Sequence, residues 1–181
     1  MIFLNFKKLK IINVFIVFGL SFLFHSAYEI FPNVITSFLF PVNESIWEHM
    51  KLIFLGYVIA GIIEYFIIKK YDLKTNNLKA SIVFNVLFNI SFFLIIFIPI
   101  NMVTEHNIFI TLSVYLLSII ITQILSYKII TNKKEYSFLN KYSYIILIII
   151  FLMLIYLTYY PIKNKVFIDE TNKKIGLNNL Y

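Results

Sequence analysis

The chain has 181 residues, of which 60% are hydrophobic, a mean hydropathy of +0.85 and a formal net charge of +7. It contains no cysteine, which excludes disulfides and thiolate chemistry. In so apolar a chain the positions of the lysines are more informative than the net charge, because they indicate membrane orientation. We expect no nucleic-acid partner.

Five apolar runs are long enough to cross a bilayer, which takes roughly 20 residues. They cover about residues 11–28, 46–68, 80–100, 107–130 and 142–161. None alternates like a barrel strand, and only helices or closed barrels satisfy their backbone in lipid. We therefore expect an all-α, polytopic helical bundle over residues 1–161, multi-pass in the cell membrane, with the bilayer as its partner. A polar tail, residues 162–181, follows.

The orientation follows from the lysines. Eleven of the sixteen lie before the first run, between the second and third, or between the fourth and fifth. The positive-inside rule places those segments and the amino terminus inside, and the tail outside. The start has the basic-then-apolar order of a signal peptide, but His25 spoils the cleavage pattern, so we expect an uncleaved helix. The short polar connections predict adjacent, antiparallel neighbours, and the tail either is disordered or packs across the outer mouth.

All three histidines, His25, His49 and His106, fall at the predicted outer ends of spans. Helical spacing gives three polar stripes. They are Ser21, His25 and Glu29 on the first helix; Ser45, His49, Ile53, Gly56, Ala60 and Glu64 on the second; and Ser81, Asn85 and Asn89 on the third. Because the first two stripes most simply face each other, we expect His25 and His49 to converge.

Imidazole and carboxylate ligands suit zinc and similar divalent ions, and a catalytic site needs three protein ligands plus water. The candidate metal ligands are His25, Glu29, His49 and His106. The candidate catalytic residues are Glu44, Glu48 and His49, and Asn43, Ser45 and Lys51 are candidates for orienting an anionic group. Metal-free proton transfer by histidine and carboxylate remains open.

Several of these residues also have structural explanations. Ser45 and Glu48 fit a capping box, with Asn43 as an alternative cap. Solvent exposure explains Glu105 and His106, at the start of a predicted helix. The intramembrane polar residues are Glu64, Asn85 and Asn89. Glu64 is either a proton-relay group or a partner for Asn85.

The stretches "HSAYE" (25–29) and "PVNESIWEHMK" (41–51) resemble a family of small, uncharacterised bacterial membrane proteins. Its signature is H-x-x-Y-E/D followed by P-V-N-E-S-x-W-E-H-x-K, and the tail stretch "VFIDETNKKIG" is a looser match. The resemblance implies no activity. It implies that the second motif acts as one unit, and that the tail closes over the site through Asp169. The implied unit comprises Asn43, Glu44, Ser45, Trp47, Glu48, His49 and Lys51.

Three functional hypotheses follow. The first is a metal-dependent or acid/base hydrolase or transferase of a lipid or envelope substrate at the outer face. The second is a transporter subunit, with a polar path running inward through Glu64, Asn85 and Asn89. The third is a non-catalytic membrane partner, which predicts that His25 and His49 lie too far apart to share an ion.

Overall fold

Capping side chains set where most of the helices begin in the computed structural model, which describes residues 5–104, 107–169 and 171–179. The side chains of Asn5, Asn33, Ser45 and Asn107 each accept a hydrogen bond from a backbone N–H of the first helical turn. The helices are α1 (Phe6–His25), α2 (Ala27–Ile30), α3 (Val34–Leu39), α4 (Ile46–Lys70), α5 (Leu78–Thr104), α6 (Ile108–Ile130) and α7 (Ser137–Tyr159).

Five helical segments are long and apolar enough to cross a membrane: Phe6–Ile30, Ile46–Lys70, Leu78–Val103, Ile108–Ile130 and Ser137–Tyr159. The predicted all-α class is therefore confirmed. The first segment differs from the prediction because the helix is interrupted at Ser26, whose φ of −98° and ψ of 9° end α1. Glu29 consequently lies on α2 and does not continue the α1 stripe that carries His25.

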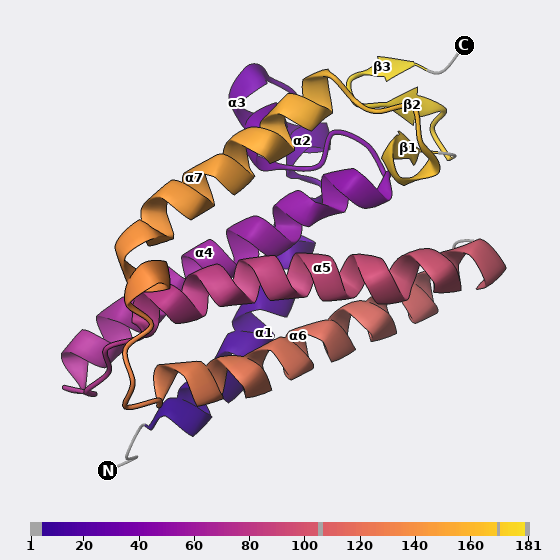
Figure 1. The fold of residues 1–181 in the computed structure, drawn as a ribbon. Coiled ribbons are helices and arrows are strands. Elements are labelled where there is room, and N and C mark those ends of the chain that lie inside the picture. Colours follow the sequence, from indigo (N-terminus) through magenta and orange to yellow (C-terminus); the bar gives the residue numbers. More distant parts are fainter. Residues whose placement is uncertain (1–4, 105–106, 170, 180–181) are drawn as a thin grey trace.

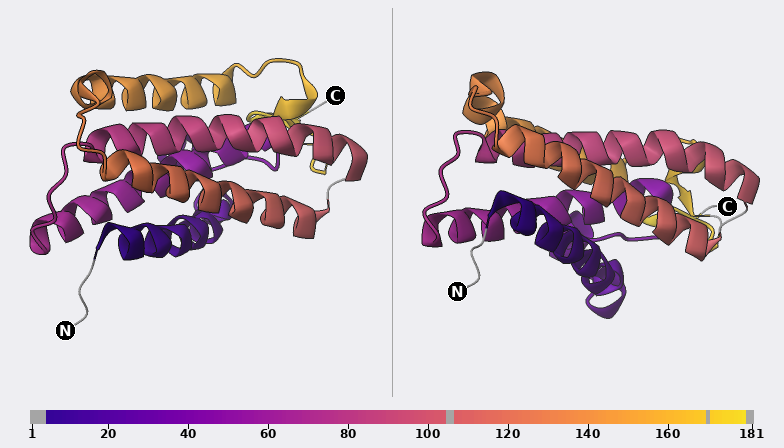
Figure 2. Two further views of the ribbon diagram at one scale, coloured as in Figure 1. Left: turned by 60° about the horizontal axis from the view of Figure 1, so that its bottom comes forward. Right: turned by 90° about the horizontal axis from the view of Figure 1, so that it is seen from below.

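Four helices form a ring in which α1 contacts α4 and α6, and α5 contacts the same two helices (Figure 1). The fifth long helix, α7, packs outside this ring against α5 and α4. Figure 2 shows α1 and α7 on opposite sides of the bundle, with the other long helices between them.

The predicted stripes of α1 and α4 do face each other. At one end Lys10 Nζ lies 2.7 Å from Glu64 Oε1, in an ion pair buried by both helices. In the middle, Val17 packs against Gly56, where the absent side chain permits close approach. At the other end His25 meets His49. The convergence expected from helical spacing is confirmed.

The expectation that α6 and α7 pack side by side is wrong, since α7 lies against α5 instead. The reason lies in the α6–α7 connection. The Asn77 amide donates to the carbonyl oxygens of Asn132 (3.0 Å) and Lys134 (2.9 Å), which ties the connection to the start of α5. The Asn140 side chain accepts from Ala80 N, so α7 also begins beside α5.

The tail is ordered over the part that the structure describes, and it packs on the motif end of the bundle (Figure 1). A short 3₁₀ helix, Lys165–Phe167, leads into three antiparallel strands: β1 (Ile168–Asp169), β2 (Lys174–Ile175) and β3 (Asn178–Asn179). Gly176 follows β2 with φ +55°, and a Cβ there would collide with the carbonyl oxygen of Thr158 on α7. This close approach requires glycine.

Gly61 and Gly19 make a matched pair for testing helix packing. A Cβ at Gly61 would lie 2.5 Å from the Ile82 side chain on α5, whereas a Cβ at Gly19 would meet nothing within 4 Å. We expect Gly61→Ala to lower the free energy of unfolding by about 1–3 kcal/mol through overpacking. Gly19→Ala should leave it equal or raise it by up to about 1 kcal/mol. Thermal unfolding in detergent measures both, and equal effects would contradict the proposed packing.

Candidate functional site

Two imidazole rings meet where α1 ends and α4 begins. The Nε2 atoms of His25 and His49 are 3.1 Å apart, and the ring centroids 5.1 Å apart. His25 is the last residue of α1, and His49 lies in the first turn of α4. The hypothesis that these histidines are too far apart to share an ion is therefore wrong.

The carboxylate of Glu44, in the loop before α4, completes the cluster. Its Oε2 atom lies 3.4 Å from His25 Nε2 and 3.5 Å from His49 Nε2. These three residues form a group whose ligand atoms all lie within 4.8 Å of one another. Their side chains are 37% (His25), 37% (Glu44) and 27% (His49) exposed, so the cluster is open to a small molecule.

The backbone fixes the tautomer of His49. Its Nδ1 atom lies 2.7 Å from the carbonyl oxygen of Ser45, and because a carbonyl only accepts, Nδ1 carries the hydrogen. In the neutral ring the Nε2 atom then carries no hydrogen, and its lone pair points toward His25 and Glu44. Two bare nitrogen lone pairs do not face each other at 3.1 Å, so a proton or a cation lies between them.

His25 and then His49, whose Nε2 atoms lie 3.4 and 3.5 Å from the carboxylate, hold the pKa of Glu44 well below its ordinary value of 4.5, against the opposing effect of burial. Glu44 is therefore ionised at neutral pH. The cluster thus combines one negative charge with two nitrogen ligand atoms.

Glu48 and Lys51 face the interior, in contrast to Glu44 and His49. Lys51 Nζ lies 2.7 Å from Glu48 Oε2, and both side chains are only 2% exposed. The ammonium also donates to the carbonyl oxygens of Ser37 (2.7 Å) and Phe40 (3.2 Å). Glu48 accepts from Thr158 Oγ1 (2.7 Å) on α7. The pair therefore fastens α3 and α7 to α4.

Only half of the expected capping box forms at the start of α4. The Ser45 hydroxyl accepts from the backbone N–H of Glu48 (3.4 Å), as a cap does. The Glu48 carboxylate does not return the bond, because Lys51 holds it. Instead Asn43 Oδ1 accepts from Ser45 N (2.8 Å). Capping therefore explains the roles of Ser45 and Asn43, whereas Glu48 forms the ion pair with Lys51.

The tail holds the loop that carries Glu44. The Asp169 carboxylate accepts from Glu44 N (2.9 Å), and the Asn43 amide donates to Gly176 O (2.8 Å). Trp47 stacks on Phe167 with ring centroids 4.9 Å apart. Burial acts to raise the pKa of Asp169, but four hydrogen bonds to the carboxylate outweigh it and lower that pKa. The donors are the backbone N–H groups of Asn172, Glu44 and Thr171 and the Asn172 side-chain amide.

The remaining sequence candidates that the structure describes lie away from the cluster. Glu29 is exposed on α2 and outside the group of three. Glu64, Asn85 and Asn89 are buried in the four-helix ring. His106, with Glu105, lies outside the described residues.

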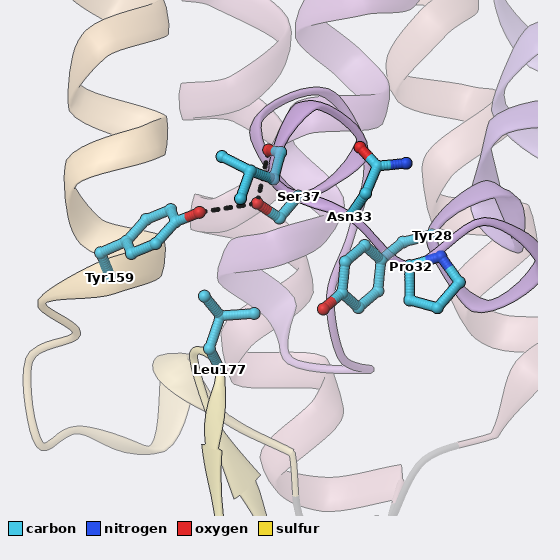
Figure 3. A pocket seen from close by; sticks show the side chains of 7 residues that line it. Tyr28, Pro32, Asn33, Ser37, Tyr159 and Leu177 are labelled. Carbon is cyan, nitrogen blue, oxygen red and sulfur yellow. Dashed lines mark hydrogen bonds between the residues drawn. The ribbon is translucent and has the colours of Figure 1, made fainter.

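A shallow hollow adjoins this end of the bundle, between α2, α3, the end of α7 and the tail (Figure 3). Tyr159 OH lies 2.8 Å from Ser37 Oγ across it, and the ring of Tyr28 and the side chain of Leu177 border it. Because the Ser37 hydroxyl donates to the Val34 carbonyl, Tyr159 is the donor to Ser37.

Sequence reasoning missed Thr158, Ser37 and Gly176 as supports of the site. Each contacts the motif from more than ten residues away in the chain: Thr158 binds Glu48, Ser37 binds Lys51 and Gly176 binds Asn43. The glycine in "KKIG" was a usable signal for a turn; a threonine or serine inside an apolar helix gives no such signal.

Fold and cluster together define a class: a helical bundle with five helices of membrane-spanning character and a histidine–glutamate cluster at one end. The chain belongs to a family of unknown function, DUF6512, whose model matches residues 1–177. No curated protein and no solved structure matches it.

Trp47 is the single tryptophan of the chain and lies against the tail, so its fluorescence reports tail docking. Because the pKa of Asp169 is lowered in the folded state, its stabilising effect is complete above the ordinary value of 3.8 and is lost as pH falls below it. We expect Asp169→Asn to shift Trp47 emission to longer wavelength at neutral pH. Acidification should do the same in the unaltered protein. Asp72→Asn, an exposed aspartate at the other end of α4, is the control, and equal spectra for both variants would contradict this docking.

The buried pair can be tested through stability. Lys51→Met leaves the Glu48 carboxylate buried without its cation and should lower the free energy of unfolding by about 3–5 kcal/mol. Glu48→Gln combined with Lys51→Met should recover part of that loss, because no buried charge then remains. Lys163→Met, at an exposed lysine, serves as the control. Unfolding of Lys51→Met at the control's temperature would contradict the structural role of the pair.

Proposed function

We propose that His25, Glu44 and His49 bind one divalent metal ion of the zinc type, and that the protein is a metal-dependent hydrolase or transferase acting on a lipid or envelope substrate. The observation that carries this proposal is the triangle of ligand atoms. Its edges are 3.1, 3.4 and 3.5 Å. Ligands bound tetrahedrally to zinc at about 2.0–2.1 Å are about 3.3–3.4 Å apart. The atoms therefore have close to the spacing that a single ion requires.

The surroundings of His49 support the same assignment. Metal-bound histidines usually donate their second ring N–H to a carbonyl or carboxylate, which fixes the tautomer and the ring orientation. The bond from His49 Nδ1 to the Ser45 carbonyl does this. Glu44 adds a negative charge that offsets part of the ion's charge, and the tail fixes its backbone through Asp169.

Three protein ligands leave a fourth tetrahedral position for water, which is the arrangement of catalytic zinc sites. The ion lowers the pKa of that water toward neutrality and polarises a substrate oxygen. The contacts of Glu44 with both histidines are made by Oε2, and no hydrogen bond to Oε1 is found among the described residues. Oε1 is therefore available to take a proton from the attacking water. In this proposal Glu48 and Lys51 hold the site in shape and do not contact the substrate.

The apolar exterior beside the cluster supports a lipid substrate. Four large apolar side chains of α2, α3 and the turn between them are more than 60% exposed: Ile30, Phe31, Val34 and Ile35. This segment joins two helices of membrane-spanning character, so a bilayer is the natural cover for it. The hollow bordered by Tyr28 and Tyr159 offers hydroxyl groups beside that apolar face (Figure 3). By the positive-inside rule, the cluster lies at the outer surface.

A metal-free alternative has one observation in its favour. A separation of 3.1 Å is also the length of a hydrogen bond between an imidazolium and a neutral imidazole. In that case the pair shares a proton that Glu44 stabilises, and the site performs acid/base chemistry without an ion.

Equilibrium dialysis of the purified protein against zinc, followed by elemental analysis, decides between the two. We expect one zinc per chain. Glu44→Gln and His49→Ala should each weaken binding by more than the roughly 10–100-fold that loss of a supporting residue costs. Glu29→Gln, which alters an exposed carboxylate only four residues from His25, should bind as the unaltered protein does.

Zinc bound equally by Glu44→Gln and Glu29→Gln would overturn the metal site. No binding by any form would favour the metal-free alternative.

A further inference from the structure

Polar side chains recur along the interior of the four-helix ring, among apolar core residues such as Val17, Ile53 and Ile119. Starting beside His25, Ser21 Oγ bonds to Tyr115 OH (2.6 Å). Deeper, the Asn89 amide nitrogen lies within hydrogen-bond distance of three hydroxyls, those of Tyr57 (3.1 Å), Ser118 (3.3 Å) and Thr122 (2.9 Å). These groups come from all four helices of the ring.

The far end of the ring holds a second charged group that the metal site does not use. Glu64 is 1% exposed and lies 2.7 Å from Lys10 Nζ, and the Asn13 amide donates to it (3.3 Å). An ionised pair in the interior of a membrane protein is costly, and such pairs often belong to proton or ion pathways.

Between these two groups lies a layer of side chains with unfulfilled hydrogen bonds. The contacts between the helices show at which level of the ring this layer lies. Asn89 meets Tyr57 and Gly61 meets Ile82, so Asn85 lies between the Asn89 level and the Glu64 level. On α6, Gln123 and Ser126 follow Thr122, which meets Asn89.

Five residues of this interior have polar atoms without a hydrogen-bond partner among the described residues: Asn13 Oδ1, Asn85 Oδ1, Asn89 Oδ1, Gln123 Oε1 and Nε2, and Ser126 Oγ. All five side chains belong to residues no more than 3% exposed. Buried polar atoms that stay unpaired cost free energy, and water is their usual partner inside proteins. Gln123 is the clearest case, because neither end of its amide has a partner.

We propose that the ring interior is a hydrated proton path that runs between the Ser21–Tyr115 hydroxyl pair and the Lys10–Glu64 pair. Water bridges the layer of Asn85, Gln123 and Ser126. Each water or hydroxyl along the path accepts one proton and passes another on, so no bond other than O–H or N–H changes. The Ser21 and Tyr115 hydroxyls begin the path at one end, and the Lys10–Glu64 pair ends it at the other. The path does not depend on the metal site.

Proton flux into liposomes tests the proposal. The full-length protein is reconstituted in phosphatidylethanolamine and phosphatidylglycerol vesicles that contain a pH-sensitive dye, and a valinomycin-driven potassium potential supplies the force. We expect a flux above that of protein-free vesicles, and its loss to that background in Gln123→Leu. Ser126→Ala should reduce the flux. Ser143→Ala, a buried helix serine on α7 outside the ring, should not.

Thermal stability gives an independent readout for Gln123→Leu, which removes no hydrogen bond between described residues. If the interior is dry, leucine removes two unpaired polar atoms, so stability rises and flux is unchanged; that result overturns the path. Flux no greater than that of empty vesicles also overturns it. Zinc content is measured on the same preparations. Intact zinc binding without flux rejects the path alone, whereas flux without zinc leaves the path standing and rejects the metal site.

Discussion

The arrangement at the functional end depends on one buried ion pair, Glu48–Lys51. Removing two charges from water is unfavourable unless further hydrogen bonds satisfy them. Here the Ser37 and Phe40 carbonyls and the Thr158 hydroxyl supply those bonds. Because those partners belong to α3, to the loop after it and to α7, satisfying the pair also fixes three segments against α4. The loop that carries Glu44 follows Phe40, whose carbonyl binds Lys51. The tail holds the same loop through the hydrogen bond from Glu44 N to Asp169.

The motif around α4 therefore divides into two sets with opposite environments. Glu48 and Lys51 are 2% exposed and saturated with partners, whereas Glu44 and His49 are 37% and 27% exposed and directed at His25. Loss of either partner of the Glu48–Lys51 pair leaves an uncompensated buried charge, so these two residues hold the structure together. Side chains that are held in a fixed position but remain accessible to a ligand are suited to binding and catalysis. The stretch of residues 41–51 thus supplies both the support and two of the three ligands, which explains why so many polar residues precede an apolar helix.

Much of the fold could be predicted from the sequence. The thickness of a bilayer sets the length of each apolar helix, and helical spacing shows which residues of two helices share a face. The meeting of His25 and His49 followed from small residues such as Gly56, which let α1 and α4 approach. The roles of Glu44 and Glu48 could not be separated. Both are acids near one helix start, and their difference depends on Thr158, 110 residues further along the chain. The exclusion of Glu29 from the cluster likewise depends on the interruption at Ser26, for which the sequence gives no proline or glycine signal. The packing of α7 depends on the side chain of Asn77, which no periodicity reveals.

The central claim is that His25, Glu44 and His49 bind a single ion. X-ray absorption at the zinc edge, on protein loaded with one equivalent of zinc, tests it most directly. The account predicts nitrogen and oxygen neighbours at about 2.0–2.1 Å with outer-shell scattering from two imidazole rings. The scattering from one ring should be lost in His25→Ala. A spectrum with oxygen neighbours alone and no imidazole scattering would contradict it.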